Sequence, residues 1–366
     1  MASPPRCCGA TPWSGWLRWP RSTAGWTSAS SGSPWRAFPS SRPALYSAPV
    51  CPTIRPMPDL NPPWWYRQAL DAVSETGSVE VLGAKIHYER WGTDGPGIVL
   101  VHGSSGHIEW WRFVAPLLAD RFRVVAFDLS GNGDSGWRDR YSGEAFAEET
   151  WRVSEAAGLP PRPFVAGHSL GGFVALETGH YFGDRLGGIV FVDYTVVSPE
   201  DYLEWGGKAD NAGYRKRRTR VYEDFDAALA RFRLLPDQPV RHPAVMDHVA
   251  RRSLREVEGG WTWKFDPTLY DHLVLGGDQR EKFVGLSCRS AVILGELSQD
   301  EGTAGADYMR RVTAGMLPVV EIPRTHHHMM FEEPLALAMA IQGIVQTWVA
   351  EDGREEMADA LARALV

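Results

Sequence analysis

Short apolar runs alternate with longer amphipathic stretches from Pro58 to the end of the chain. Each run is rich in Val, Ile, Leu or Phe, which is typical of strands that are buried on both faces of a parallel sheet. The runs of this kind are residues 97–103, 122–131, 163–169, 185–194, 291–296 and 317–325. A further stretch, residues 78–92, has two β-rich runs around Gly83 and predicts a hairpin.

The stretches between these runs have the apolar spacing of helices. We expect helices over 61–73, 110–120, 143–158, 170–182 and 333–351, and Gly158 is a typical residue to close the third. Strands that alternate with helices predict an α/β fold, with a mostly parallel central sheet and helices on both faces.

One interval interrupts the alternation. Nearly a hundred residues separate the run that ends at Asp193 from the run that begins at Ala291, and helices are expected there over 220–235 and 243–257. An insertion of this length predicts a lid subdomain rather than a loop. The predicted organisation is a core in two parts, residues 57–193 and 290–366, with a helical lid over 194–289.

Residues 1–56 have a different composition. They are crowded with Pro, Ser, Trp and Arg and contain no Asp, Glu or Lys. They show no hydrophobic periodicity, and they lack the apolar core of a secretory signal. Our hypothesis is that this extension is non-native or disordered, and that the native chain begins at or near Met57.

Charge and composition exclude some functions. The formal net charge of −7 argues against a nucleic-acid-binding surface, and no apolar run is long enough for a transmembrane helix. Of the cysteines, Cys288 alone lies outside residues 1–56, so a reduced cytoplasm is the simple interpretation. Arg outnumbers Lys, which suggests a high-GC bacterial source. The sequence leaves a homodimer open.

The chemistry is concentrated around Ser169. Residues 167–171 read Gly-His-Ser-Leu-Gly, and they follow a predicted strand and open a predicted helix. A sharp strand–turn–helix elbow would expose the serine hydroxyl beside free N–H groups, whereas small flanking residues would let strand and helix come close. By itself the motif fits either a nucleophile or an ordinary glycine-rich turn.

Other stretches extend the pattern. His-Gly-Ser-Ser-Gly follows the first buried run at 102–106, Asp-Leu-Ser-Gly-Asn-Gly-Asp-Ser occupies 128–135, and a histidine triplet with Glu-Glu-Pro follows the last run at 326–334. Together with the elbow, they make residues 78–350 resemble the α/β-hydrolase superfamily. The likeness is to its serine-nucleophile branch with a lid, which includes esterases and C–C bond hydrolases.

The resemblance implies roles for single residues. The backbone N–H groups of Ser104 and Leu170 would form the oxyanion hole, and His102 would be structural. In relatives the catalytic histidine lies seven residues before the proline of the last motif, which gives His327; His326 and His328 are the neighbouring alternatives.

The catalytic acid departs from the usual pattern. The usual position in the family holds Ser298 here, and Glu296, Asp300 and Glu301 are out of register. A minority of the superfamily, including haloalkane dehalogenases, takes the acid from the end of the preceding strand, where this chain has Asp193. We prefer Asp193 and keep Asp300 as the alternative. Many relatives have an Asp at the position of Asp193 that only caps the end of the strand.

No metal or organic cofactor is implied. Three consecutive histidines of an extended segment cannot all face one ion, and the sequence shows no second ligand cluster. We expect a small, largely apolar substrate, with Trp110, Trp111 and His168 lining its pocket; core packing is the alternative role for each tryptophan.

The sequence therefore predicts a serine hydrolase that cleaves an ester-like acyl bond through Ser169, His327 and Asp193. Two alternatives within the fold are a C–C bond hydrolase and a cofactor-free perhydrolase. A third is a ligand-binding protein without catalysis. Ser169 itself argues against epoxide hydrolase or dehalogenase chemistry, because those enzymes have Asp at this position.

Overall fold

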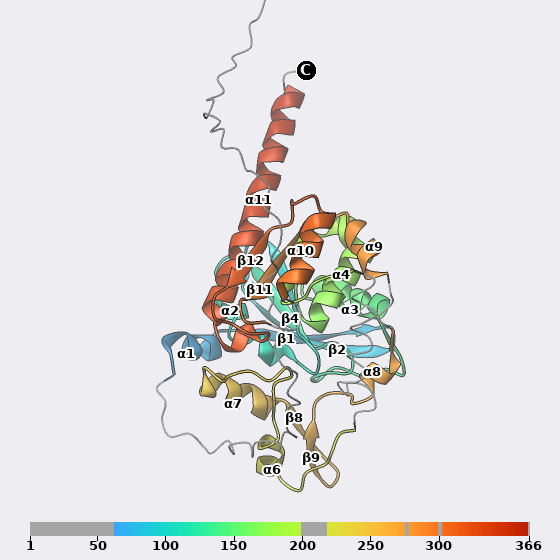
Figure 1. Ribbon diagram of the computed structural model, residues 1–366, viewed down its shortest axis with the longest axis vertical. Coiled ribbons are helices and arrows are strands. Elements are labelled where there is room, and N and C mark those ends of the chain that lie inside the picture. The colour runs from blue at the N-terminus through green and yellow to red at the C-terminus, as the bar shows by residue number, and fades with distance from the viewer. Residues whose placement is uncertain (1–61, 199–217, 275–277, 299–301, 365–366) are drawn as a thin grey trace, which may run out of the picture. The chain divides into compact units, whose positions relative to one another are not determined.

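The computed structural model describes residues 62–198, 218–274, 278–298 and 302–364. Its centre is an eight-stranded sheet in the order β1-β2-β4-β3-β6-β7-β11-β12 (Figure 1). The strands are β1 (Glu75–Val81), β2 (Ala84–Trp91), β3 (Gly97–Val101), β4 (Arg123–Phe127), β6 (Phe164–His168), β7 (Gly188–Val192), β11 (Ser290–Gly295) and β12 (Val319–Ile322). The pairings from β4 to β12 are parallel, and β2 is antiparallel to both of its neighbours.

Both faces of the central strands are buried, as the apolar runs predict. In β7, Val190 and Val192 join one hydrophobic core, while Ile189 and Phe191 join the other. Successive side chains of a strand point to opposite faces of a sheet, so a strand between two cores must be apolar at every position.

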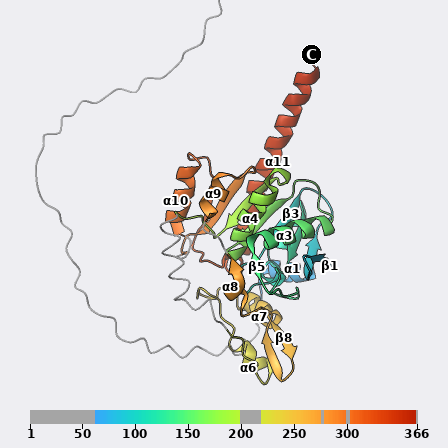
Figure 2. The same cartoon turned by 90° about the vertical axis from the view of Figure 1, so that its right-hand side faces the viewer.

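Helices cover the two faces. One core takes side chains from α1 (Trp64–Asp71), α2 (Ala115–Leu118) and α11 (Pro334–Ala364). The other takes them from α3 (Gly143–Ala156), α4 (Leu170–Phe182), α9 (Gln279–Val284) and α10 (Gly302–Val312). Figure 2 shows α3, α4, α9 and α10 on the face turned toward the viewer. The fold is therefore α/β with helices on both faces.

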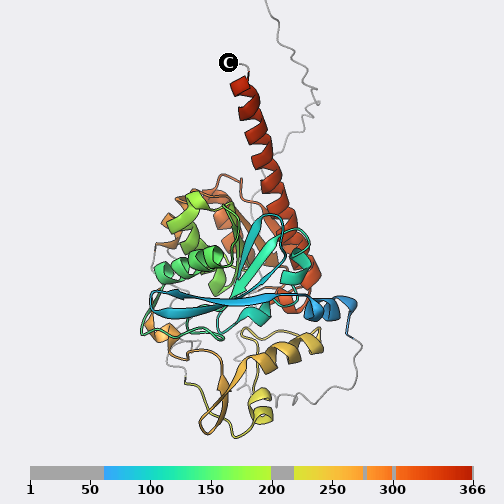
Figure 3. The same cartoon turned by 180° about the vertical axis from the view of Figure 1, so that it is seen from behind.

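The described residues between β7 and β11 are only partly helical. They contain α6 (Phe225–Leu229), α7 (Pro243–Arg252), the hairpin strands β8 (Leu254–Val257) and β9 (Gly260–Trp263), α8 (Leu269–His272) and β10 (Leu273–Val274), and then α9. In the views of Figures 1 and 3, α6, α7, β8 and β9 lie together below the sheet. We call residues 218–274 the inserted segment.

Some predicted helices are wrong in extent. The helix expected over 243–257 ends at Arg252, because residues 254–257 pair with β9. The helix expected over 220–235 is reduced to α6, and the one expected over 110–120 to α2, preceded by the 3₁₀ turn η1 (Ile108–Trp110). For residues 254–257, the pairing with β9 overrides the local helix propensity. Within the described ranges, no helix has the length and apolar character that crossing a membrane requires.

Candidate active site

Ser169 stands at the turn between β6 and α4. Its backbone has φ +53° and ψ −118°, a region that non-glycine residues rarely adopt, and its N–H donates to the carbonyl of Val192 at 3.1 Å. Such a conformation costs on the order of 1–3 kcal/mol and persists where the surrounding structure imposes it. The serine is therefore held in a strained turn at the carboxyl end of the sheet.

Two glycines permit this turn. A Cβ atom on Gly167 would lie 1.9 Å from the carbonyl oxygen of Gly171, and a Cβ on Gly171 would lie 2.3 Å from that of Val101. Both contacts are with backbone atoms, which a side-chain rotation cannot relieve. The small residues of the motif therefore have a steric reason, because strand, helix and the neighbouring strand β3 touch here.

The His-Gly-Ser-Ser-Gly loop lies against the serine. A Cβ on Gly103 would be 3.2 Å from Ser169 Cβ, and the loop closes with a hydrogen bond from Gly106 N–H to the Gly103 carbonyl at 3.0 Å. The loop thus brings Ser104 next to the elbow. Leu170 is the first residue of α4, where an N–H has no acceptor within the helix.

His102 connects this loop to the next one. Its Nδ1–H donates to the carbonyl of Gly103 at 2.7 Å, and its Nε2 accepts from the N–H of Leu129 at 3.0 Å. Burial lowers the pKa of His102 to about 4, so the ring is neutral and keeps this donor–acceptor pattern. Both nitrogens are used for the loop geometry, which gives His102 a structural role.

The stretch 128–135 forms a tight loop around a buried carboxyl. Asp128 accepts from the N–H groups of Ile108 at 2.7 Å and Asp134 at 2.8 Å. Burial raises the pKa of Asp128 to about 7. Its contact with Ile108 fixes the start of η1, and η1 carries Trp110.

His327 and Asp193 are in direct contact. His327 Nδ1 lies 2.6 Å from Asp193 Oδ2, and both side chains are buried. A carboxylate accepts, so Nδ1 carries the proton and Nε2 carries the lone pair of the neutral ring. His327 is also linked to the elbow, since His168 Nε2 donates to its carbonyl at 2.9 Å.

Asp193 accepts two hydrogen bonds besides the one from His327. Its Oδ1 accepts from the N–H of Gly295 at 2.9 Å, and its Oδ2 accepts from the hydroxyl of Ser298 at 2.5 Å. Ser298 is the residue at the usual family position of the acid. The two positions are adjacent because β7 and β11 are neighbouring parallel strands, so their carboxyl ends meet.

The other acidic alternatives have different surroundings. Glu296 accepts from the backbone N–H of Arg324 at 2.6 Å, and it thereby braces the turn after β12. Asp300 and Glu301 lie outside the described residues.

No sequence motif predicts the contacts that hold the histidine triplet. Glu332, fully buried, accepts from His326 N–H at 2.6 Å and from His326 Nδ1 at 2.9 Å. Gln238 of the inserted segment binds the backbone of His328 on both sides, accepting from its N–H at 2.8 Å and donating to its carbonyl at 3.3 Å. No local pattern marks a pairing between residues 90 positions apart.

Of the residues expected to line the pocket, Trp110 lies among the site histidines and Trp111 lies in the core. Trp110 packs on His328 and Phe331, each with ring centroids 5.2 Å away, and it lies 6.2 Å from His168. Trp111 is completely buried within the first core, where it packs against the sheet. Burial, followed by the neighbouring His327, holds the pKa of His168 well below its usual range.

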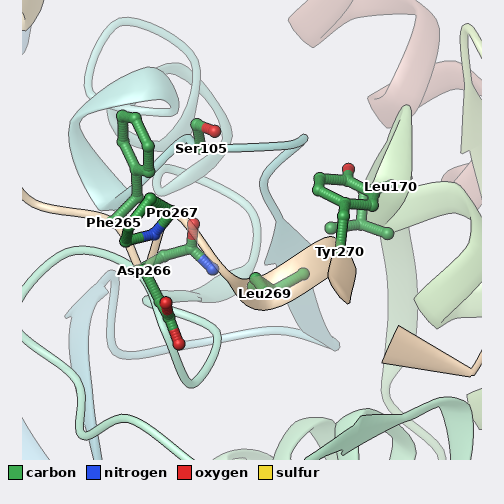
Figure 4. A pocket seen from close by; sticks show the side chains of 8 residues that line it. Ser105, Leu170, Phe265, Asp266, Pro267, Leu269 and Tyr270 are labelled. Atoms are coloured by element: carbon green, nitrogen blue, oxygen red, sulfur yellow. The ribbon is translucent and has the colours of Figure 1, made fainter. Parts of the chain in front are cut away.

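The inserted segment closes the site beside Leu170. A cavity of about 10 Å³ lies there between Ser105, Leu170 and the residues of 265–270 (Figure 4). The hydroxyl of Tyr270 forms a short hydrogen bond with that of Ser104. This volume is room for about one water molecule and is too small for an acyl group.

Comparison with known proteins agrees with this geometry. Residues 98–340, about two thirds of the chain, match the model of the alpha/beta hydrolase family. The chain belongs to the α/β hydrolase family.

Several relatives of this α/β hydrolase are esterases. It is 27% identical over 266 residues to esterase Rv0045c of Mycobacterium tuberculosis, a match that covers 70% of this chain and 85% of that protein. It is 34% identical to pimeloyl-[acyl-carrier protein] methyl ester esterase of Edwardsiella ictaluri, covering 39% of this chain and 54% of that one. The chain is accordingly an enzyme of the hydrolase class, and both of these relatives are named as esterases.

Solved structures show the same fold. The crystal structure of Rv0045c has a TM-score of 0.61 at 23% identity, with 77% of this chain and 95% of that chain covered. The thioesterase domain from the curacin biosynthetic pathway also has a TM-score of 0.61, at 21% identity, with 74% and 99% covered.

Proposed function

We propose that this α/β hydrolase cleaves carboxylic esters of small, largely apolar substrates through an acyl-enzyme on Ser169. Its general base is His327, and its acid is Asp193. The observation that carries the proposal is the 2.6 Å contact between His327 Nδ1 and Asp193 Oδ2, next to the strained elbow that presents Ser169.

The reaction follows from this arrangement. Nε2 of His327 takes the proton of the Ser169 hydroxyl as the oxygen attacks the acyl carbon. Asp193 keeps the proton of His327 on Nδ1 and stabilises the imidazolium. The N–H groups of Ser104 and Leu170 bind the oxyanion, and His327 then protonates the leaving alcohol. Water hydrolyses the acyl-enzyme by the same steps.

Substrate size and polarity follow from the walls of the site. The aromatic ring of Trp110, which lies against His168 and His328, supplies apolar surface. The space at Leu170 admits only one water in this conformation, so an acyl group enters when residues 265–270 shift. The names of the esterase relatives support an ester rather than a C–C bond. A cytoplasmic location and a homodimer stay predictions from the sequence.

The test is hydrolysis of short-chain p-nitrophenyl esters by the wild type and by Ser169→Ala. We expect the wild type to turn over acetate or butyrate esters, and the variant to lose activity by about 10⁶-fold, as when a serine nucleophile is removed elsewhere. Labelling by a fluorophosphonate should fail in the variant alone. A wild type that neither hydrolyses esters nor reacts with the probe would favour the ligand-binding alternative, whereas labelling without ester turnover would favour another bond type.

A further inference from the structure

The small cavity beside Leu170 has a polar atom without a partner in its wall. Ser105 and residues 265–270 form part of this wall (Figure 4), and Asn132 of the 128–135 loop lines the cavity as well. Asn132 is 1% exposed, and its Oδ1 has no hydrogen-bond partner in the part of the chain that the structure describes. Buried polar groups are nearly always paired, so an unpaired acceptor facing a cavity indicates a ligand that donates to it.

The orientation of the Asn132 amide follows from its other hydrogen bond. Its Nδ2 donates to the carbonyl of Ser130 at 3.3 Å. A half turn of the amide would place Oδ1 against that carbonyl oxygen, and two acceptors cannot form a hydrogen bond with each other. Oδ1 is therefore the atom left over, and the cavity fits a donor rather than an acceptor.

Backbone contacts fix the position of this acceptor. Asn132 forms an antiparallel bridge with Phe265, and next to it Gly133 N–H donates to the carbonyl of Lys264 at 2.7 Å. Residues 267–270 lie beyond this pairing, so they can move without moving Asn132. An acceptor that is held in place loses little freedom when a ligand binds, which favours discrimination between ligands.

The carboxylate of Asp266 in the same wall is already paired. Its Oδ2 accepts from the hydroxyl of Tyr141 at 2.7 Å, and its Oδ1 accepts from the N–H of Thr268 at 2.8 Å and from its hydroxyl at 2.7 Å. Phe265 and Leu269 add apolar surface. A cation would lose its hydration here with no free carboxylate in return, so the surroundings favour a neutral donor such as a hydroxyl or an amide N–H.

We propose that Asn132 is a specificity-determining residue, whose Oδ1 accepts a hydrogen bond from a hydroxyl or amide N–H on the acyl part of the substrate. This rests on the proposed function, in which the acyl group reaches the cavity when its cover shifts. Leu170 directly follows the nucleophile and lines the same cavity, so an acyl chain on Ser169 that extends past Leu170 meets Asn132. The substrate class is then an ester of a small hydroxy acid or N-acylamino acid whose remaining surface is apolar.

Matched pairs of p-nitrophenyl esters test the preference in the wild type. The pairs are lactate and isobutyrate, β-hydroxybutyrate and isovalerate, and N-acetylglycine and levulinate. In each pair a methyl or methylene group replaces the donor, and the pairs place the donor at different distances from the carbonyl. Each ratio is taken relative to alkaline hydrolysis of the same esters, which removes their intrinsic reactivity.

We expect the wild type to favour the donor-bearing ester of at least one pair by about tenfold in kcat/KM. The reason is that the other ester leaves Asn132 Oδ1 unpaired, and sites built to bind a hydroxyl or N–H reject analogues that lack it. A wild type that hydrolyses the esters without preference in any pair would overturn the proposal.

Variants in one loop assign the preference to its residue. Asn132→Leu should abolish the preference, because leucine has a similar shape and no acceptor, and Asn132→Ala should do the same with less risk of crowding. Asp134→Asn is the matched control: its side chain is more than half exposed, and the preference should stay. A preference that persists in both Asn132 variants would refute the role of Asn132.

Binding to Ser169→Ala separates this inference from the proposed function. This variant lacks the nucleophile, so calorimetry can compare the Kd values of the two esters in each pair. The donor-bearing ester of at least one pair should bind about tenfold tighter, and adding Asn132→Leu should remove the difference. A binding difference in a protein whose wild type hydrolyses no ester would refute the proposed function and leave the Asn132 site standing. Ester turnover with no preference in rate or in binding would refute this inference alone.

Discussion

The strand ends of the sheet and the inserted segment shape the same site in different ways. At the ends of β6, β7 and β11, backbone groups determine the positions: Ser169 N–H bonds to Val192, Asp193 N–H bonds to Ile293 at 2.7 Å, and Gly295 N–H bonds to the Asp193 carboxylate. The inserted segment contacts Ser104 and His328 through side chains, with Tyr270 on the Ser104 hydroxyl and Gln238 on the backbone of His328.

This difference suggests that the strand ends position the reacting groups, whereas the inserted segment controls access to them. Backbone bonds between parallel strands fix the register, so the reacting groups are positioned by the sheet itself. Side-chain contacts are individually worth about 0.5–1.5 kcal/mol and can be exchanged one at a time. We therefore expect changes at the strand ends to abolish catalysis or folding, and changes in the inserted segment to alter rates by small factors.

The sharpest test at the strand ends exchanges the acid between two strands. Asp193→Asn should lower kcat for a p-nitrophenyl ester by about 10⁴-fold, because His327 loses the group that fixes its tautomer. Asp193→Ser combined with Ser298→Asp moves the carboxylate to the residue whose hydroxyl lies 2.5 Å from Asp193 Oδ2. Since contacting residues couple by about 0.5–3 kcal/mol, we expect the pair to recover on the order of tenfold in activity.

Ser298→Asp alone is the control for this exchange. It places a second carboxylate beside Asp193 and should not raise activity. A double variant no better than Asp193→Asn would show that the end of β11 cannot aim an acid at His327.

Alanine substitutions at two glycines compare the tight packing of the elbow with an open helix surface. Gly171→Ala places a methyl group 2.3 Å from the carbonyl of Val101, whereas nothing lies within 4 Å of a Cβ on Gly343 in α11. We expect Gly171→Ala to lower the free energy of unfolding by several kcal/mol, and Gly343→Ala to raise it by about 1 kcal/mol through helix propensity. Urea unfolding of both variants provides the measurement. A Gly171→Ala protein as stable as wild type would contradict the close packing of elbow and strand.

Acid sensitivity provides a test of the loop beside the elbow. The pKa of His102 is lowered to about 4 in the folded chain, so the unfolded chain binds a proton first as the pH falls. The stability that the neutral His102 ring contributes is fully present above pH 6.5 and is lost as the pH falls from about 6.5 to 4. The loss is roughly 1.4 kcal/mol per pH unit, or about 3 kcal/mol in all.

The variant His102→Asn isolates this contribution. The raised pKa of Asp128, about 7, gives the opposite slope in both proteins, so the prediction concerns the difference between them. Between pH 7 and 4, the free energy of unfolding of the variant should fall less steeply with decreasing pH than that of the wild type. The difference between the two slopes should correspond to about one bound proton. Equal slopes would show that His102 is not held neutral.

The smallest effect is expected in the inserted segment. Tyr270→Phe removes the hydroxyl that bonds to Ser104 and should lower kcat/KM by about 3–10-fold, the equivalent of one hydrogen bond. Tyr222→Phe, in the same segment, is the control and should leave the rate unchanged. A loss of several hundredfold in Tyr270→Phe would place the inserted segment in the catalytic machinery and remove the distinction drawn above.

The sequence predicted the sheet well and the inserted segment poorly. The apolar runs correspond to β3, β4, β6, β7, β11 and β12, because a strand buried on both faces must be apolar along its length. In the inserted segment, residues 254–257 follow a helix directly and become a strand by pairing with β9. No local sequence feature distinguishes this strand from a continued helix, because its hydrogen bonds come from the pairing with β9.

For the candidate site, motif order and spacing indicated Ser169 and His327. They left the acid open, because two strand ends are equivalent in the sequence and only their spatial relation to His327 distinguishes them. Glu332, Gln238 and Tyr270 were not found at all: an ordinary charged or polar residue acquires a role here through a partner far along the chain.

The sequence by itself determined the α/β architecture, the elbow at Ser169 and the family, because each depends on residue types at short, fixed spacings. The tertiary structure alone brought Asp193 and Ser298 side by side, and it alone joined His168 to His327 and His328. The physical reason is that proximity between distant segments is decided by strand register and core packing. These properties belong to the whole fold and leave no mark on a short stretch of residues.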